Sequence, residues 1–548
     1  MYRSNRNLAN TNESIAGQLI DYGTKVKKEY VLKDVIPTDL AKYHIDRKCW
    51  IHDLEFFDTT YNCIGVNVTS LIGHEKVSLS KAMRMLYREI IRLTNEQSGG
   101  IGFIDFDKDM SAYITNESDD EIAEEIYELF NDLNVYVRKG CEKAYITLNL
   151  GLDTSENGRR FSRIMLEQYE CGNSEGKPYI FPNLVFKIKN GINSLEEDRN
   201  YDIFQKSCEV TSKCMIPTYF NCDCSINYDA DPHVIGIMGC RTRVVNNIFG
   251  EKTALNRGNI ACVTMNLVQI ALESGNDLCR FKKKLNKVME HAKELLLYRF
   301  NTVCQNNDFS YLREKKLYLD SEQSNRIMLR NGTLSIGFTG LWDAMEIITH
   351  KKINKEYILK DSASTAYGIV SFMKDKVSQY SIEEKMNFSL LASAAEGISG
   401  EFPKYDKEEY KEDKWIADKE YYTNSFHVPV NIDISCIEKI AAEGQYHKLC
   451  TGGAITYVEL KEVPIGNIEG IMDIIKFAKM QDCSYFGINF PLDVCKKCGF
   501  KGMIGNNCPS CGSSKILKLR RVSGYLSDGC KFTHGKYAEL KARKANEI

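Results

Sequence analysis

Four cysteines near the end of the chain constrain its fold more than any other feature of the sequence. Cys495, Cys498, Cys508 and Cys511 form the pattern C-x2-C-x9-C-x2-C, with a glycine after each pair. Two residues between cysteines allow a tight turn to direct both thiolates at one ion, so two such turns supply four sulfur ligands to zinc. Since the protein provides all four ligands, the spacing predicts a structural zinc ion. A thioredoxin-type redox pair is the other use of C-x-x-C, and two pairs together argue against it.

The composition limits the class of protein. Of the 548 residues, 43% are hydrophobic and 27% are charged, which is typical of a globular chain. The 72 basic and 74 acidic residues give a formal net charge of −2, so the basic footprint of a nucleic-acid or membrane partner is missing. The chain begins with a polar segment unlike a signal peptide and has no run of about 18 apolar residues. We therefore expect a cytoplasmic protein.

Helical and strand patterns alternate along most of the chain. Ser118 and Glu121 form a capping box ahead of apolar residues at helical spacing. Amphipathic helical patterns also cover residues 78–93 and 281–300. Between the helical patterns lie short apolar or β-branched runs, at 144–152, 183–189, 261–267 and 334–341. The alternation indicates an α/β architecture.

The composition changes near residue 490, where cysteine, glycine and lysine become dense. We therefore predict a large α/β domain over residues 1–490 and a smaller C-terminal module over residues 491–548.

Motifs along the whole chain resemble those of one enzyme family. Gly524 lies in "RVSGY", which follows the cysteine cluster and is similar to the radical loop of glycyl radical enzymes. The most specific matches are "MGCRTRVV" (238–245) and "RGNIACVTMNLVQIALES" (257–274). "CWIHDLEFFDTTYNCIGVN" (49–67) and "NEQSGGIGFIDFD" (95–107) match in the same order. Together these motifs resemble the anaerobic (class III) ribonucleoside-triphosphate reductases.

The resemblance implies a fold and a place for each motif. The expected fold is a ten-stranded α/β barrel of two five-stranded halves around a central finger loop, with a C-terminal zinc ribbon. Cys240 is expected at the tip of the finger, with Gly524 beside it. Members of the family often carry an ATP-cone regulatory domain ahead of the His-Asp-Leu segment. His52 stands so near the start of the sequence that we expect this domain to be absent.

The resemblance also implies catalytic roles. Gly524 would carry a backbone radical, which only glycine accommodates because no Cβ opposes a flattened Cα. Cys240 would become the thiyl radical that removes the 3′ hydrogen of the substrate, and Cys63 would be the second cysteine of the site. Asn259 would hydrogen-bond the ribose or formate. His52 corresponds to a family histidine near the site, and a purely structural role is the alternative.

Cofactors and partners follow from the same resemblance. It implies ribonucleoside triphosphates as substrates, formate as the co-substrate that supplies electrons, and nucleoside triphosphates as allosteric effectors. It implies a separate radical-SAM activating enzyme with an iron–sulfur cluster, and a homodimer. Gly99 and Gly100 would line the substrate cavity, although a plain turn also explains them. Ser523 stands where the family often has cysteine.

Two other functions fit parts of the sequence. A different glycyl radical enzyme, similar to formate acetyltransferase, would share the radical loop, but its adjacent pair of cysteines is missing here. A zinc-ribbon nucleic-acid-binding protein would share the cysteine cluster. The balanced charge and the large α/β part argue against that second alternative.

Overall fold

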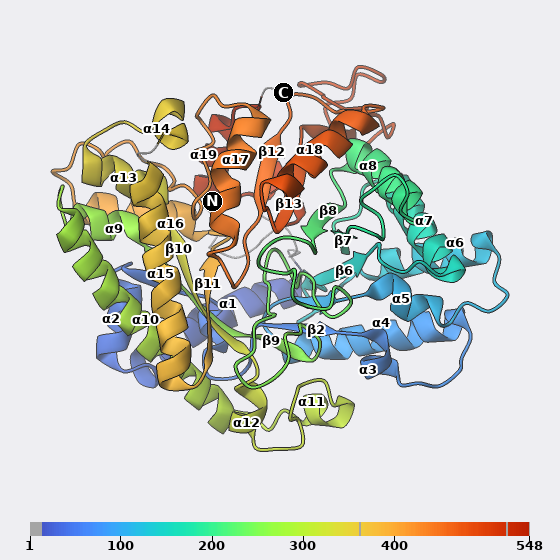
Figure 1. Ribbon diagram of the computed structural model, residues 1–548, viewed down its shortest axis with the longest axis horizontal. Coiled ribbons are helices and arrows are strands. Elements are labelled where there is room, and N and C mark those ends of the chain that lie inside the picture. The colour runs from blue at the N-terminus through green and yellow to red at the C-terminus, as the bar shows by residue number, and fades with distance from the viewer. Residues whose placement is uncertain (1–13, 361–362, 522–523, 547–548) are drawn as a thin grey trace.

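A sheet of eleven strands, ten of them in one continuous order, occupies the centre of the molecule (Figure 1). The computed structural model describes residues 14–360, 363–521 and 524–546. The strand order is β11-β10-β9-β2-β3-β6-β7-β8-β13-β12, and β1 pairs with β9 outside this path. The strands are β1 (Cys49–Ile51), β2 (Cys63–Val66), β3 (Ile101–Phe103), β6 (Ile146–Leu150), β7 (Asn183–Ile188), β8 (Thr218–Asn221), β9 (Arg257–Asn266), β10 (Thr333–Thr339), β11 (Asn387–Ala392), β12 (Thr456–Glu459) and β13 (Tyr485–Asn489).

The sheet consists of two parallel halves. One half contains β2, β3, β6, β7 and β8, and the other contains β9, β10 and β11 together with β12 and β13. The halves meet in antiparallel pairs, β2 with β9 and β8 with β13. Leu391 of β11 also forms a parallel bridge with Gly453, just before β12. The two ends of the sheet are thereby joined, and the expected ten-stranded α/β barrel is confirmed.

Helices surround the strands on the outside (Figure 1). Parallel strands covered in this way are buried on both faces, which explains their largely apolar sequences. The capping box of Ser118 and Glu121 starts α6 as predicted. The helices are α1 (Ile15–Tyr30), α2 (Thr38–Ile45), α3 (Val68–Ile72), α4 (Leu79–Glu96), α5 (Phe106–Ser111), α6 (Asp119–Asp132), α7 (Glu156–Cys171), α8 (Tyr201–Cys214), α9 (Leu267–Leu272), α10 (Leu278–Asn306), α11 (Ser310–Lys315), α12 (Asn325–Leu329), α13 (Leu341–Thr349), α14 (Lys355–Leu359), α15 (Ala363–Glu384), α16 (Ile398–Glu409), α17 (Cys436–His447), α18 (Ile468–Met480) and α19 (His534–Ala542).

A separate small sheet carries the cysteine cluster. Its strands are β15 (Lys501–Gly502), β14 (Leu492–Cys495), β16 (Ile516–Arg521) and β17 (Leu526–Asp528), in this order. Gly524 lies in the connection from β16 to β17. A hairpin of β4 (Tyr136–Arg138) and β5 (Glu142–Lys143) forms the remaining sheet.

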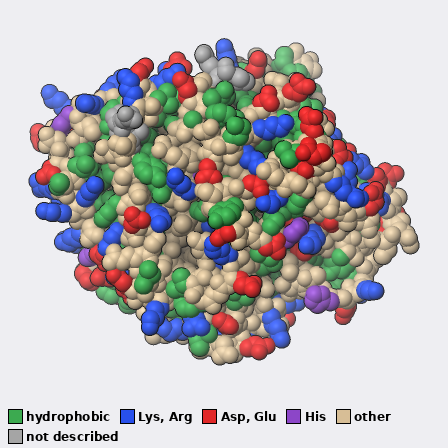
Figure 2. Space-filling model, in the orientation of Figure 1, with side chains coloured by type: hydrophobic (Ala, Val, Ile, Leu, Met, Phe, Trp, Pro, Cys, Tyr) green, Lys and Arg blue, Asp and Glu red, His purple; other side chains and the backbone are tan. Residues whose placement is uncertain are grey.

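The surface carries both signs of charge. Acidic and basic side chains are interspersed on the face shown in Figure 2. Among the described residues, no helix has the length and apolar character needed to span a membrane.

Candidate active site

A finger loop carries Cys240 into the barrel. The loop connects β8 to β9, and its tip is a tight turn in which the Met238 N–H donates to the Thr242 carbonyl at 3.0 Å. Gly239 takes a positive φ of 64° in this turn, a conformation that favours glycine. Cys240 follows directly and is half-buried.

Two polar side chains of β6 hold the finger. Thr147 donates to the Gly239 carbonyl at 3.1 Å. The Asn149 amide donates to the Ile237 carbonyl at 3.0 Å and accepts from the Ile237 N–H at 2.9 Å. Thr147 and Asn149 are two residues apart on a strand, so both point to the same side, into the barrel. The Asn149 amide therefore satisfies both the N–H and the carbonyl of Ile237, as the backbone of a neighbouring strand would.

The other half of the barrel contacts the finger beyond its tip. Arg241, which is 1% exposed, donates to the carbonyls of Ala392 at 3.2 Å and Ser393 at 3.3 Å. The Arg243 N–H donates to the Gly452 carbonyl at 2.9 Å. Because both halves of the barrel hold it, Cys240 has a fixed position between them.

Cys63 lies at the start of β2, beside the finger. Its sulfur is 3.8 Å from the position that a Cβ on Gly239 would occupy. The Gly100 N–H donates to this sulfur at 3.3 Å, and the thiol donates to the Asn62 side-chain oxygen at 2.8 Å. Burial raises the pKa of Cys63 to about 12, and nearby Cys240 adds to the effect. Cys63 is therefore a neutral thiol with a hydrogen atom to give.

Gly99 and Gly100 allow the finger to come this close. A Cβ on Gly99 would lie 2.6 Å from the Cys63 sulfur, and a Cβ on Gly100 would lie 2.9 Å from the Cα of Gly239. Both distances are shorter than van der Waals contact. The two glycines thus form the surface against which Cys63 and the finger tip pack.

Gly524 touches the backbone of Cys240. A Cβ on Gly524 would lie 2.0 Å from the Cys240 carbonyl oxygen and 2.5 Å from its Cα. No other amino acid could take this place without moving one of the two loops. Val522 and Ser523, which precede Gly524, lie outside the described residues.

The neighbours of Gly524 anchor the loop. The Tyr525 hydroxyl donates to the Glu396 carboxylate at 2.8 Å, and its ring packs edge-on against Tyr145 with centroids 5.5 Å apart. Burial raises the pKa of Glu396. Arg521 is fully buried, and it donates to the Asn489 side-chain oxygen at 2.6 Å and to the Gly524 carbonyl at 3.4 Å. The loop is thus held on both sides of the glycine.

Asn259 lies opposite Cys63 in the pairing of β9 with β2. Its amide is 3.2 Å from the Thr333 hydroxyl and 2.9 Å from the Ser335 hydroxyl. The register of β9 against β10 shifts just after Asn259, where Ile260 is an additional residue. Such a bulge changes which side chains face the interior.

His52 lies just beyond β1. It hydrogen-bonds to a residue of β9 that comes after Asn259 in the strand. Its Nε2 is 2.7 Å from the Thr264 hydroxyl, which lies 2.6 Å from the Ser393 hydroxyl. Burial lowers the pKa of His52, so the ring is neutral at pH 7. The structure thus gives His52 a hydrogen-bonding role inside the barrel, toward Thr264 of β9.

Several side chains that hold this site were not predicted from the sequence: Tyr145, Thr147, Asn149, Glu396, Arg521 and Tyr525. The sequence does carry a signal for Thr147 and Asn149. In "AYITLNL" these two residues alternate with apolar residues in an otherwise buried strand. Buried polar groups of this kind are normally hydrogen-bonded, so they point to a partner inside the barrel.

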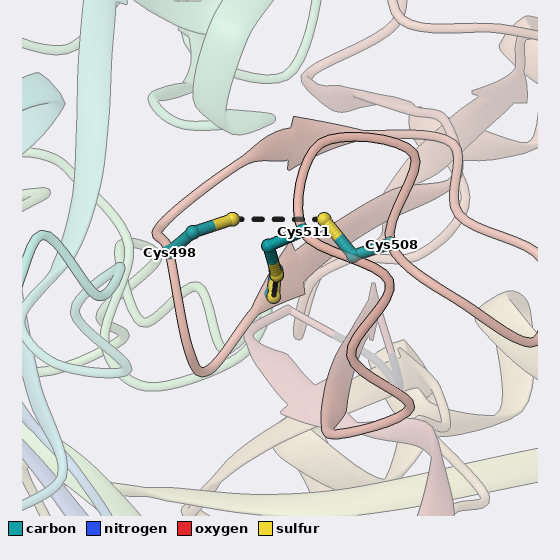
Figure 3. A group of neighbouring side chains, drawn as sticks. Cys498, Cys508 and Cys511 are labelled. Atoms are coloured by element: carbon teal, nitrogen blue, oxygen red, sulfur yellow. Dashed lines mark hydrogen bonds between the residues drawn. The ribbon is translucent and has the colours of Figure 1, made fainter.

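The four cysteines come together as the spacing predicts, and Figure 3 labels three of them, Cys498, Cys508 and Cys511. Their sulfur atoms all lie within 4.8 Å of one another. Cys495 is 3.5 Å from Cys511, and Cys498 is 3.6 Å from Cys508, sulfur to sulfur. Thiolates about 2.3 Å from a tetrahedral zinc ion would lie about 3.8 Å apart, so the cluster fits zinc. Gly499 and Gly512 have positive φ values of 75° and 70° in the two turns.

We expect one zinc ion per chain, and we expect Cys508→Ser to lose it. A closed zinc site contributes folding free energy directly, so the variant should expose its C-terminal segment to proteolysis while the barrel stays folded. Metal analysis and limited proteolysis measure the two effects. Cys171→Ser, at an exposed cysteine on α7, is the matched control and should keep both metal and protection. Zinc retained in full by Cys508→Ser would contradict the assignment.

A barrel with a cysteine finger against a glycine loop defines the glycyl radical enzymes, and solved structures share the fold. An anaerobic ribonucleotide reductase superposes with a TM-score of 0.78 at 19% identity, over 98% of this chain and 90% of that chain. The Thermotoga maritima enzyme in complex with dATP and CTP gives 0.76 at 18% identity, over 97% and 92%. The B12-independent glycerol dehydratase from Clostridium butyricum gives 0.59 at 13% identity, over 97% and 73%.

Sequence comparison identifies the family. The model of the anaerobic ribonucleoside-triphosphate reductases matches residues 7–545, and the chain belongs to this family. The Escherichia coli K12 reductase is 28% identical over 579 residues, covering 94% of this chain and 80% of that protein. The reductase of Enterobacteria phage T4 is 25% identical over 609 residues, covering 99% and 98%.

The family assignment confirms the resemblance seen in the sequence. The protein is an oxidoreductase that converts ribonucleotides into deoxyribonucleotides in the absence of oxygen. The two alternatives, a formate acetyltransferase-like enzyme and a zinc-ribbon nucleic-acid-binding protein, are wrong.

We expect Asn149→Ala to uncouple radical formation from reduction. The finger loses its two bonds at Ile237, and displacement of a reacting group by about 1 Å can cost about 100-fold in rate. The glycyl radical signal should remain while deoxynucleotide formation falls by about this factor. Asn131→Ala is the control, because the Asn131 side chain donates to the Tyr127 carbonyl within α6, outside the barrel. An unchanged reduction rate would show that Asn149 does not position the finger.

Proposed function

We propose that the chain reduces ribonucleoside triphosphates by moving a radical from Gly524 to Cys240, with formate as the reductant. The observation that carries the proposal is the backbone contact between these two residues, where a Cβ on Gly524 would lie 2.0 Å from the Cys240 carbonyl oxygen. Hydrogen transfer needs reacting groups to be held close and in a fixed orientation. The loop and the finger are each anchored on both sides, which supports such transfer.

The proposed chemistry balances in atoms and electrons. The Cys240 thiyl radical takes the 3′ hydrogen of the ribose, and the 2′ hydroxyl leaves as water. Formate gives up two electrons as it becomes carbon dioxide, so one deoxynucleotide, one water and one carbon dioxide form from one ribonucleotide, one formate and one proton. Cys63, a neutral thiol beside Cys240, supplies a hydrogen atom to the ribose and is restored by formate, and Cys240 returns the 3′ hydrogen so that its thiyl radical forms again. Asn259 hydrogen-bonds the ribose or formate.

The proposed function also requires an activating enzyme, a zinc ion, a second subunit and nucleotides. A radical-SAM enzyme with an iron–sulfur cluster removes the hydrogen from Gly524, the zinc ion has a structural role, and the protein works in the cytoplasm as a homodimer. Nucleoside triphosphates act as substrates and as effectors. Structures of the Thermotoga maritima reductase contain dATP with CTP, and dATP in a specificity site, which supports this last point.

A formate balance tests the proposal. The activated enzyme is supplied with ribonucleoside triphosphate and carbon-labelled formate without oxygen, and labelled carbon dioxide is compared with deoxynucleotide. We expect equal amounts, and we expect Cys63→Ala to form neither. Deoxynucleotide formed with a thioredoxin-like reductant but without carbon dioxide would overturn the formate assignment. The absence of any deoxynucleotide from the fully radical-loaded enzyme would overturn the whole proposal.

A further inference from the structure

A chain of polar side chains runs from Cys63 to a carboxylate. The Cys63 sulfur is 2.8 Å from the Asn62 side-chain oxygen, and the Asn62 amide nitrogen is 2.5 Å from the Asp53 carboxylate. The Ser98 hydroxyl donates to the same carboxylate oxygen at 2.9 Å. The proposed chemistry uses Cys63 but gives no role to Asn62, Asp53 or Ser98.

The backbone around Asp53 holds this carboxylate in place. Asp53 has φ 50° and ψ 47°, in the left-handed region that side chains rarely adopt. The buried Arg299 donates to the carbonyls of His52 at 2.7 Å and Asp53 at 3.4 Å. Conformations of this kind persist where the surroundings hold them, and they are concentrated at functional sites.

The side chain of Asn62 is not needed to place Cys63 in the sheet. The Asn62 N–H donates to the Asn259 carbonyl at 2.9 Å, and the Asn62 carbonyl accepts from the Gly99 N–H at 2.7 Å. These backbone bonds position β2 whatever side chain stands at residue 62. The amide of Asn62 is therefore available for a task other than folding.

The chain fixes the direction of the Cys63 S–H bond. A carboxylate only accepts hydrogen bonds, so the Asn62 nitrogen, which only donates, faces Asp53. The Asn62 oxygen then faces Cys63, and because this oxygen only accepts, the thiol hydrogen points to it.

The sulfur of Cys63 accepts hydrogen bonds from other groups. The Gly100 N–H donates to it at 3.3 Å. Burial raises the pKa of Cys63 to about 12, while bonds from the Gly100 backbone and from the Thr242 side chain act in the opposite direction. Thr242 belongs to the turn of the finger, so the finger meets a lone pair of this sulfur and not its hydrogen.

We propose that Asn62 and Asp53 are positioning residues that hold the Cys63 hydrogen away from Cys240 and thereby keep the thiyl radical on the finger. The inference rests on the proposed function, in which both sulfurs react. With its hydrogen directed at a Cys240 thiyl radical, Cys63 would pass that hydrogen atom to the Cys240 sulfur. One S–H bond would break as an equal one formed, leaving a thiol on Cys240 and the radical on Cys63.

A radical that reaches Cys63 too early is consumed by formate. The hydrogen atom of formate passes to the Cys63 sulfur, which restores the thiol and leaves a carbon dioxide radical anion. Without a ribose radical to reduce, this anion leaves the site, and the enzyme loses its radical. The hold does not block the later step, because rotation about the Cβ–Sγ bond of Cys63 releases the hydrogen from Asn62.

Infrared spectroscopy tests the hydrogen bond in the resting protein. The S–H stretching band of Cys63 is the difference between each protein and the same protein with Cys63→Ala, and bonding to an acceptor lowers its frequency. We expect Asn62→Leu to raise the frequency. Asp53→Gly, which suits the positive φ, should raise it by less because the amide stays. Asn276→Leu, at an exposed side chain between α9 and α10, is the matched control and should leave the band unchanged.

Electron paramagnetic resonance tests the consequence. Activated protein is kept without oxygen and without ribonucleotide, and the glycyl radical doublet is followed with and without formate. We expect the doublet of wild type and of Asn276→Leu to persist in both cases, and that of Asn62→Leu to decay only with formate. Adding Cys63→Ala to Asn62→Leu should restore persistence, because the path through Cys63 is removed.

Three outcomes would overturn the inference. One is a wild-type Cys63 band at the frequency of a free thiol, a result that does not depend on whether any Asn62 or Asp53 variant folds. Another is a persistent doublet in Asn62→Leu with formate present. The third is decay at the same rate with and without formate, which would give the chain a structural role only. The labelled formate balance of the wild type tests the proposed function separately, so a failure of one is distinguishable from a failure of the other.

Discussion

Gly524→Ala should show no radical after anaerobic activation and no ribonucleotide reduction. The added Cβ would meet the Cys240 carbonyl oxygen at 2.0 Å and its carbonyl carbon at 2.6 Å, both backbone atoms of a finger held from both halves of the barrel. The alanine would also oppose the flattened Cα that a backbone radical needs. Electron paramagnetic resonance measures the effect directly, because the remaining α-hydrogen of a glycyl radical splits its signal into a doublet.

Gly529→Ala is the matched control for this experiment. Gly529 lies in the same C-terminal segment, but the nearest atom to a Cβ built there is 3.6 Å away, an ordinary contact. We expect this variant to keep the doublet and the activity. Exposure of the activated wild type to air should also cleave the chain near Gly524, and Gly524→Ala should stay intact. A full doublet from Gly524→Ala would contradict the assignment of the radical.

The cysteine cluster and the general architecture could be predicted from the sequence because their signals are local. Two C-x-x-C turns fix the geometry of four thiolates within about twenty residues. The capping box of Ser118 and Glu121 likewise acts within one turn of a helix. The family motifs then supplied the barrel, since periodicity alone does not distinguish one α/β topology from another.

The contacts that hold the radical site could not be predicted, because they join segments far apart in the chain. Asn149 and Ile237 bond across 88 residues, and Tyr525 reaches Glu396 across 129. The bulge after Asn259 also depends on how β9 and β10 pair, and no single strand contains that information. A role of His52 at the substrate stays a prediction.

Strand β16 connects the cysteine cluster to the Gly524 loop. This strand pairs with β14 at the cluster and ends in Arg521, whose side chain reaches Asn489 of the barrel and the Gly524 carbonyl. Further along, Arg543 bonds Glu459 at 3.4 Å and Glu539 at 3.1 Å, so α19 is also tied to the barrel by charge. The Gly524 loop therefore lies between two anchored segments, β16 and α19.

Cys240→Ser should abolish ribonucleotide reduction and leave the Gly524 radical able to form. Serine keeps the shape of the side chain, so the finger turn, the Thr147 bond and the contact with Gly524 should all persist. A hydroxyl does not replace the thiol, because an oxygen radical is much harder to form than a sulfur radical. We expect a doublet of wild-type size after activation, and deoxynucleotide formation below detection.

Cys304→Ser is the control for this substitution, because Cys304 lies half-buried on α10, outside the barrel. It should keep both the doublet and the activity. The comparison also separates two explanations for an inactive Cys240→Ser. If the doublet is lost as well, the substitution has disturbed the loop that carries Gly524, and Cys240 has a packing role beside any chemical one. If the doublet stays and reduction is lost, the sulfur itself is required between the glycyl radical and the ribose. Turnover retained in Cys240→Ser would show that the tip of the finger takes no hydrogen from the substrate.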